Sequence, residues 1–599
     1  MNQIKVKLED QILKTIYSLY PQTTEEINKD FVEISVPGEF SFGDFSTTIC
    51  LKLAKIVKQH PMTIAQSILK SLGKVEDLGI SKVEIKSPGF INFFVNTEII
   101  ITQVNYLLAK PQDFGKNTIS LKVFETFLKK QSKDIKLRHP PSHKATADKE
   151  IRLLFEFADP NPFKEFHIGH LRNITLGESY CRLLENLGIE VIRVNYQGDV
   201  GIHVAKAIWG FRKLETKTWD VKTLAKAYVL GSQAYEENAD AKKEILAINL
   251  AIYNHDKSVE EEWKQGRKIS LEAFEEIYKR VGTVYKRYFF ESEVANEGIK
   301  IVKDHIKDGV FEKSEGAIVY KGEKDGLHTR VFITKEGYAT YEAKDLALAI
   351  IKYEEFKYDV SIIITGHEQA EYFKVMLAAL SHVRPDLREK TLHMTFGMVN
   401  LKGEKMTSRK GNVITGNWLL DEARKKAFGL ITKEDYTPVE KEDISEKVAV
   451  GAVKYSMLKF SPKSDILFNF DESVSLEGDC GPYIMYTFAR TQSVLRKIRN
   501  SKFEIRNKNY KLNNEETALL RLIYKYTQVC FEAGVNFAPN VMTKYLFDLA
   551  QAYNLFYNKH QILNAQDSER KFRLALNQAV GEILKKGLYL LGIDTVSKM

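Results

Sequence analysis

Residues 156–173, EFADPNPFKEFHIGHLRN, connect two segments with different hydrophobic patterns. Ile151–Phe157 is an apolar-rich strand candidate, and apolar residues spaced by three and four predict a helix from about Ile168 to Leu187. Val191–Asn195 is the next candidate strand. A strand, a loop, a helix and a second strand make half of a doubly wound parallel sheet of the kind that binds nucleotides. The stretch therefore predicts an α/β core of Rossmann-like type.

The loop lies where such sheets bind ligands, beyond the C-terminal end of a strand. A helix N-terminus favours phosphate, because it presents free N–H groups and a partial positive charge. His167 and His170 can each donate to a phosphate oxygen, and Gly169 leaves room for a flat base. The alternative is a histidine pair that only caps the helix, and the spacing alone does not decide between the two.

A second candidate loop is the cationic stretch 405–411, KMTSRKG. Its three cations, with glycines at 403 and 411, suit a loop that closes over a triphosphate and neutralises the departing pyrophosphate. A solvated basic turn would have the same composition. Lys405 and Lys410 are the candidates for the phosphate contacts.

The composition is that of a folded protein with several domains. A chain of 599 residues is too long for one core, and 44% hydrophobic with 28% charged residues argues against disorder. The net charge of +9 is a mild indication of a polyanionic partner such as RNA. The four cysteines form no CxxC pair, which predicts free thiols in a reducing cytoplasm. No apolar run approaches a membrane span and the N-terminus lacks a secretory signal, so no membrane partner is expected.

Changes of pattern along the chain predict three domains. Residues 1–115 mix helical periodicity with paired strands, residues 116–440 alternate strands and helices, and residues 441–599 are nearly all helical. Residues 202–330, mostly helical and charged, look inserted into the sheet domain. Residues 129–150 are basic and contain two adjacent prolines, as an exposed connector does.

The order of the two loops resembles that of the class I aminoacyl-tRNA synthetases, in which a HIGH sequence precedes a KMSKS-like loop. The chain is similar to the arginyl-tRNA synthetase family in EFADPNPFKEFHIGHLRN (156–173), VIRVNYQGDVG (191–201), YEAKDLALA (341–349), KMTSRKGN (405–412) and GDCGPYIMYTFAR (478–490). The resemblance runs through the whole chain. It implies a Rossmann-like (HUP-type) parallel-sheet catalytic domain, an α+β N-terminal domain that binds the tRNA elbow, and an all-α anticodon-binding domain.

The resemblance also implies the reaction. Arginine is activated with ATP to arginyl-adenylate and transferred to the 3′-terminal adenosine of tRNA(Arg), giving AMP and pyrophosphate. ATP is expected as a substrate with Mg²⁺, and no structural metal is expected. A monomeric, cytoplasmic enzyme that needs bound tRNA before activation is implied. A nucleotidylyltransferase of another kind, or a non-catalytic relative, would not need all of these motifs.

Tyr341 and Asp345 are the candidates for binding the arginine side chain. They lie four residues apart on a predicted helix and therefore share a face. Asp345 can accept two parallel N–H bonds from a guanidinium, a geometry that lysine lacks, and Tyr341 can pack on the same group. A surface aspartate beside a core tyrosine would show the same spacing. The resemblance implies that Glu156 adds a second carboxylate and that Asn161 and Gln369 hold the α-amino end.

The ATP site and the catalytic residues are expected at overlapping positions. For the ATP site we expect His167, Gly169, His170, Gly366, Met398, Val399 and Lys405. The catalytic residues are expected to be His167, His170, Lys405 and Lys410. The KMSKS-like loop departs from the family pattern at Ser408, where lysine is usual, and the sequence does not decide whether Arg409 or Lys410 replaces that lysine.

Aromatic residues in two domains are candidates for tRNA contacts. Tyr483 and Tyr486 suit stacking on splayed bases, although core tyrosines on one helix have the same spacing. The resemblance favours an anticodon role for both and implies that Met599 reaches the same pocket. It also places Asn92 and Phe94, within GFINFFVN at 89–96, near the D-loop of tRNA, although strand alternation alone would produce that pattern.

Overall fold

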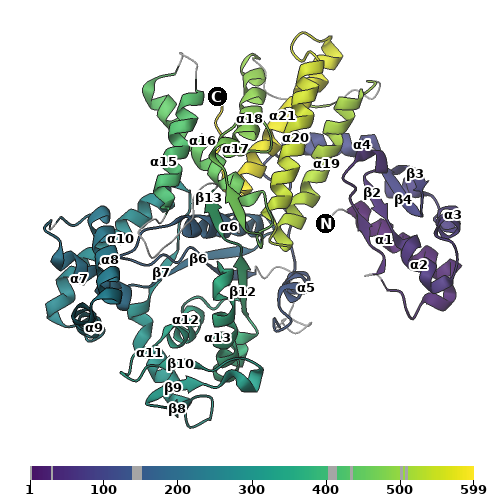
Figure 1. The fold of residues 1–599 in the computed structure, drawn as a ribbon. Coiled ribbons are helices and arrows are strands. Elements are labelled where there is room, and N and C mark those ends of the chain that lie inside the picture. The colour runs from purple at the N-terminus through teal and green to yellow at the C-terminus, as the bar shows by residue number, and fades with distance from the viewer. Residues whose placement is uncertain are drawn as a thin grey trace.

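A five-stranded parallel sheet lies at the centre of the molecule (Figure 1). This computed structural model describes residues 3–28, 31–137, 151–216, 218–401, 414–431, 436–498, 503–505 and 510–599. The strand order is β12-β11-β5-β6-β7, and all neighbours run parallel. The strands are β5 (Arg152–Glu156), β6 (Glu190–Gln197), β7 (Arg287–Phe290), β11 (Val360–Gly366) and β12 (Thr391–Phe396).

The sheet is covered on both faces, because apolar residues follow one another along its strands. Leu153 and Phe155 of β5 belong to one core, whereas Leu154 between them belongs to another. Helix α6 (Ile168–Glu185) packs in the first core, and α12 (Tyr341–Phe356) and α13 (Ala370–Val383) pack in the second. The apolar-rich segment 151–157 thus contains a strand, β5, with a helix layer on each side.

The winding of the chain reverses between β5 and β11. From β5 the chain continues to β6 and β7 on one side of the sheet, and β11 and β12 extend the other side. Open α/β sheets bind ligands in the crevice beyond the strand ends at such a point. Glu156 ends β5 and Gly366 ends β11, so two predicted site residues meet here.

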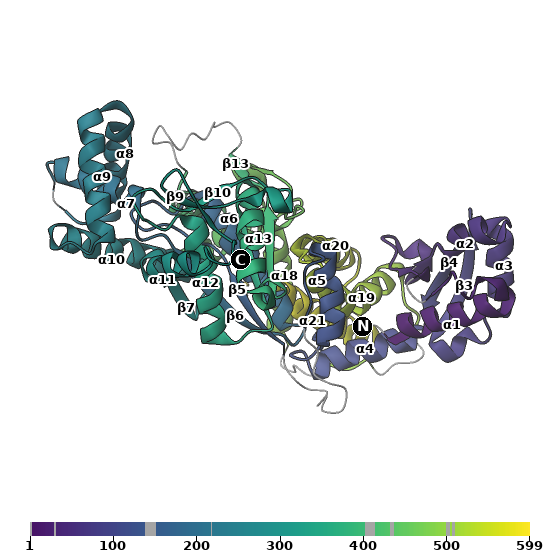
Figure 2. The same ribbon diagram turned by 90° about the horizontal axis from the view of Figure 1, so that it is seen from below.

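The N-terminal domain is an antiparallel sheet packed with helices. Its strand order is β1-β2-β4-β3, and a hairpin with Ser87-Pro88-Gly89 at its turn joins β3 and β4. The elements are α1 (Gln3–Leu19), β1 (Ile34–Ser35), β2 (Phe45–Thr47), α2 (Ile49–Val57), α3 (Pro61–Ser71), β3 (Ile80–Lys86), β4 (Phe90–Val95) and α4 (Thr97–Ala109). Helix α5 (Leu121–Gln131) leads toward the central sheet. Figure 2 shows this domain at one end of an elongated molecule.

The opposite end of the molecule in Figure 2 is formed by helices of the expected insertion, α7 (Ile202–Lys213), α8 (Val221–Glu237), α9 (Ala239–Tyr253) and α10 (Lys257–Arg280). The same segment also contains β7, which pairs with β6 as the edge strand of the main sheet. Residues 202–330 are therefore not one inserted body. After α11 (Glu291–Asp304), a small antiparallel sheet follows, made of β8 (Glu312–Ser314), β9 (Ala317–Tyr320) and β10 (Arg330–Ile333).

The C-terminal part is a helical bundle that packs on α6 and on α4. Three of its helices carry proline in the first turn, where the missing N–H costs nothing: Pro438, Pro482 and Pro539. After α14 (Pro385–Arg388), the elements are β13 (Val399–Leu401), α15 (Gly416–Leu430), α16 (Pro438–Leu458), β14 (Ile466–Phe468), α17 (Phe470–Ser473), α18 (Gly481–Arg496), α19 (Asn514–Val535), α20 (Pro539–Lys559) and α21 (Asp567–Leu590).

The predicted fold class is confirmed: a parallel-sheet domain, an α+β N-terminal domain and a helical C-terminal domain are all present. In the ranges that the structure describes, no helix is both long enough and apolar enough to span a bilayer.

Candidate active site

A cavity of about 510 Å³ opens at the point where the sheet winding reverses. We call it the switch-point cavity. Its walls come from the loop after β5, the start of α6, the ends of β6 and β11, and the first turns of α11, α12 and α13. Segments that are more than 200 residues apart in the sequence therefore share one site.

His167 and His170, the histidine pair, both cap α6 and line the cavity. His167 Nδ1 accepts hydrogen bonds from the backbone N–H of Gly169 (3.1 Å) and of His170 (3.3 Å). In return, the backbone N–H of His167 donates to His170 Nδ1 at 3.2 Å. The two rings stack with centroids 3.6 Å apart. The capping alternative and the ligand-binding alternative are thus compatible.

The capping bonds also set the protonation of the histidine pair. Because both Nδ1 atoms accept hydrogen bonds, the ring proton of each neutral histidine is on Nε2. Burial lowers the pKa of His167 to about 4 and that of His170 well below its ordinary value. Both rings are therefore neutral N–H donors at physiological pH.

Lys164 is a cation of the same loop that lies near the histidine pair. After burial, its charge is a further cause of the lowered pKa of His167 and His170, and it also lowers the pKa of buried His203. Its ammonium lies 5.4 Å from the ring centre of Tyr228. The described residues thus place one positive charge beside the histidine donors.

Four acidic residues, Glu156, Asp159, Glu291 and Asp345, line the cavity and form what we call the carboxylate cluster. Glu156 pairs with Lys352 and Glu291 pairs with Lys344, each at 2.6 Å and almost fully buried. Asp159 accepts from the backbone N–H of Tyr196 at 2.8 Å, and Tyr372 donates its hydroxyl proton to Asp345. Among the described residues, neither Asp159 nor Asp345 forms an ion pair.

The carboxylate cluster has four acidic groups but only two lysine partners among the described residues. Burial raises the pKa of Asp345 to about 8, with the neighbouring Glu156 and Glu291 adding to the effect. Burial likewise raises the pKa of Asp159 well above its ordinary value. A buried cation with several N–H donors would relieve both groups, since an opposite charge favours the ionised carboxylate. The carboxylate cluster therefore favours a cationic ligand over an anionic one.

The structure brings most of the predicted substrate residues into the lining of this one cavity: Glu156, Asn161, His167, Gly169, His170, Tyr341, Asp345, Gly366, Gln369 and Met398. Tyr341 is 56% exposed, at the mouth. Val399 is not in the lining, because its side chain is buried where β13 pairs with β14. Lys405, Ser408, Arg409 and Lys410 lie outside the described residues, as do residues 138–150 of the basic stretch.

The sequence interpretation missed several lining residues: Asp159, Tyr196, Glu291 and Tyr372. Asp159 and Tyr196 stand inside quoted motifs and could have been weighed there. Glu291 had no local signal, because its partner Lys344 is 53 residues away. Gly198 lets Asn161 and Glu291 lie close to its backbone. A Cβ at this position would lie 2.3 Å from Asn161 Oδ1 and 3.0 Å from Glu291 Oε1.

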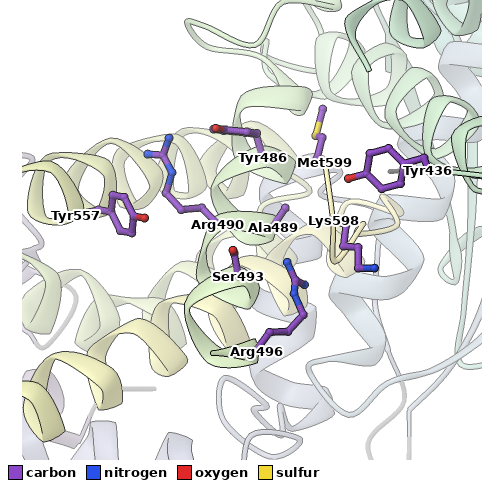
Figure 3. A pocket seen from close by; sticks show the side chains of 9 residues that line it. All are labelled: Tyr436, Tyr486, Ala489, Arg490, Ser493, Arg496, Tyr557, Lys598 and Met599. Carbon is purple, nitrogen blue, oxygen red and sulfur yellow. The ribbon is translucent and has the colours of Figure 1, made fainter. Parts of the chain in front are cut away.

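A second cavity, of about 340 Å³, lies in the helical domain beside the C-terminal residues (Figure 3). We call it the tail cavity. Its lining includes two of the predicted tRNA contacts, Tyr486 and Met599. The Arg490 guanidinium lies 5.0 Å from the ring centre of Tyr486 and also 5.0 Å from that of Tyr557. Tyr483 is instead directed into the helix packing, where its hydroxyl accepts from Asn554 at 2.9 Å.

The two predicted contacts in the N-terminal domain lie away from open surface. Asn92 is 1% exposed, and its Oδ1 accepts from the hydroxyl of Ser46 at 2.7 Å. Phe94 is half-buried between Lys82 and Arg521 of α19. Contact of either side chain with tRNA stays a prediction. The described residues contain no group of three or more His, Cys, Asp or Glu side chains arranged to bind a metal.

Three family models match the chain, in the order of the three structural parts. Residues 2–95 match the arginyl tRNA synthetase N terminal domain, residues 135–470 the catalytic domain of tRNA synthetases class I (R), and residues 484–599 the DALR anticodon binding domain. With the parallel sheet and the switch-point cavity, these matches define a class I aminoacyl-tRNA synthetase. The chain belongs to the arginyl-tRNA synthetase family, and its activity is the ligation of arginine to tRNA.

Relatives match over nearly the full length. The arginine–tRNA ligase of Fusobacterium nucleatum is 30% identical, with 99% of each chain covered, and that of Halothermothrix orenii is 28% identical, with 100% of each chain covered. The arginyl-tRNA synthetase of Thermus thermophilus has the same fold, with a TM-score of 0.75 at 24% identity over 99% of this chain and all of that one. The enzyme of Plasmodium falciparum gives 0.76 at 21% identity over the whole of both chains.

Proposed function

We propose that the switch-point cavity binds arginine and ATP side by side, with the carboxylate cluster facing the guanidinium and the histidine pair facing the phosphates. The observation behind this assignment is that acidic groups and N–H donors line the same cavity. Four carboxyl groups in the cavity wall, of which Glu156 and Glu291 are almost fully buried, suit a ligand that offers only N–H donors. Two neutral N–H donors at a helix N-terminus suit phosphate oxygens.

Asp345 is the proposed bidentate partner of the guanidinium. It lines the cavity without a lysine of its own among the described residues, whereas Glu156 and Glu291 are already paired. Tyr341 lies one helical turn before it, in position to pack on the planar group. Asn161 and Gln369, on the loop after β5 and at the start of α13, would hold the α-amino end.

The proposed reaction has two steps. The arginine carboxylate attacks the α-phosphorus of ATP in line, a new P–O bond forms, and pyrophosphate leaves. The terminal ribose of tRNA then attacks the carbonyl carbon of the adenylate through its 2′-hydroxyl, and AMP leaves. Neutral Nε2–H groups of His167 and His170 would donate to the phosphate oxygens as charge spreads over them. Catalysis is mainly positioning and charge stabilisation.

The departing pyrophosphate needs cations. Lys405 and Lys410 are proposed for this role from their loop, and Lys164 is proposed as a third cation on the side of the histidine pair. Mg²⁺ would arrive with ATP. A monomer acting in the cytoplasm, with tRNA bound before activation, is part of the same proposal.

The tail cavity is the proposed site for a splayed anticodon base. Tyr486 and Tyr557 flank Arg490 there, and both an aromatic ring and a guanidinium plane can stack on a base. Met599 would cover the base from the tail. Tyr483 would support this site through its bond with Asn554, without touching RNA.

Asp345→Ala tests the assignment of the arginine site. The KM for arginine should rise by about a hundredfold or more while the KM for ATP stays within about threefold, because a charge-assisted bidentate contact is lost from one substrate only. Aminoacylation assays with each substrate varied in turn give both values. Asp308→Ala, at an exposed position, is the matched control. Equal effects on both KM values would remove Asp345 from the guanidinium site.

A further inference from the structure

The hydroxyl of Tyr196 is a buried polar group without a hydrogen-bond partner among the described residues. Tyr196 is the seventh residue of β6 and lines the switch-point cavity. Leaving a buried hydroxyl unpaired costs free energy, so an isolated one inside a binding cavity calls for an explanation in terms of the ligand.

The surroundings of this hydroxyl are acidic. Burial raises the pKa of Tyr196 well above its ordinary value, and the nearby carboxylates Glu291, Asp345, Glu156 and Asp199 add to the effect. The phenol therefore stays protonated and neutral. The neighbouring tyrosine of the cavity differs, because Tyr372 already donates its proton to Asp345.

The backbone of Tyr196 is held in place independently of its hydroxyl. Its N–H donates to Asp159 Oδ1 at 2.8 Å, and its ring packs against the core formed with α12 and α13. The side chain is thus fixed by apolar contacts and the backbone by a carboxylate. Tyr196 lines the cavity with a buried oxygen that has no donor among the described residues.

A guanidinium could supply the hydrogen-bond donor that the Tyr196 oxygen lacks. It carries five N–H donors and no acceptor, so a planar site that binds it fully needs more acceptors than one carboxylate provides. We propose that the Tyr196 hydroxyl oxygen accepts a hydrogen bond from the guanidinium of the substrate and is a further determinant of arginine specificity. This inference rests on the proposed placement of the guanidinium at the carboxylate cluster.

Tyr196→Phe removes only the oxygen. The KM for arginine should rise by about tenfold, the size of one hydrogen bond to a charged group, with kcat and the KM for ATP within about twofold. The apparent Tm of the free protein should stay the same or rise, because an unpaired buried hydroxyl is lost. A hydroxyl with a purely structural role would instead lower Tm and leave the KM for arginine unchanged.

Tyr278→Phe is the matched control. The Tyr278 hydroxyl is also buried and without a partner in the described structure, but it does not line the cavity. This variant should show the same Tm behaviour with an unchanged KM for arginine. A KM for arginine within about twofold of the parent in Tyr196→Phe would overturn the inference. If Asp345→Ala raises that KM and Tyr196→Phe does not, only the role of Tyr196 fails; if neither does, the proposed arginine site itself fails.

Discussion

At the scale of single residues, the most informative group is the carboxyl of Asp345, whose pKa is raised. Asp345 lies among other acids, and burial raises its pKa to about 8. In the free protein it is therefore mostly protonated at neutral pH. In the proposed site the guanidinium binds to the ionised form, so arginine binding would displace a proton.

Displacement of this proton predicts that the KM for arginine rises as the pH falls. Below the pKa of Asp345, each unit of falling pH makes the ionised form about tenfold rarer, so the KM for arginine should rise about tenfold from pH 7 to pH 6. Above about pH 8 the KM should level off, because Asp345 is ionised without cost. Steady-state aminoacylation across this range measures the effect. Asp345→Asn should bind arginine weakly with no such slope, and a parent KM that is flat from pH 6 to 7 would contradict the argument.

At the scale of elements, the start of α6 combines two roles that can be separated. His167 Nδ1 caps the helix, and its Nε2–H is the proposed phosphate donor. Asparagine is among the best N-cap residues, and it keeps an acceptor but offers no donor in the place of Nε2.

His167→Asn should therefore leave the apparent Tm within about 1 °C of the parent, since the cap is kept, and lower kcat by about a hundredfold. Thermal unfolding and aminoacylation measure the two effects. His60 offers a control, because its Nδ1 caps α3 in the same way, accepting from the backbone N–H of Met62 at 3.3 Å. His60→Asn should change neither value, and a large loss of Tm in His167→Asn would show that the cap and the donor are not separable.

Elements also show how far the sequence could predict this molecule. Helix α6 was predictable because apolar residues recur along it at helical spacing, and β11 because its apolar residues follow one another. The edge strand β7 was missed because it has four residues and only two of them are buried. Helical spacing could not separate Tyr483 from Tyr486, since residues three apart share a face and only the neighbouring helix decides which one is covered. Asn92 shows the same limit in a strand. Alternation predicts which residues share a face of the sheet, but it does not show whether other residues cover that face.

At the scale of the whole molecule, the C-terminal tail belongs to the tail cavity. Arg496 Nη1 donates to the carbonyl oxygen of Ser597 at 2.8 Å and so holds Lys598 and Met599 at the lining. Arg496→Met should raise the KM for tRNA several-fold, with the KM values for arginine and ATP unchanged, because the tether is lost far from the small substrates.

Aminoacylation with tRNA as the varied substrate measures this effect. Arg570→Met is the control for loss of charge, because Arg570 lies on α21 and its ion pair among the described residues is local, with Asp567 at 3.0 Å. An unchanged KM for tRNA in Arg496→Met would indicate that the tail is held without Arg496, and a similar rise in both variants would assign the effect to net charge alone.

Helix α6 connects the histidine pair with the helical domain. Its 18 residues span about 27 Å. The histidine pair is at its first turn, while Ser179 and Arg182 near its other end donate to the carbonyl oxygens of Leu590 (3.1 Å) and Tyr589 (3.0 Å) at the end of α21. Those residues directly precede the tail that reaches the tail cavity. Because α6 joins these two places directly, a small tilt of the bundle would act on the histidine pair through this one helix.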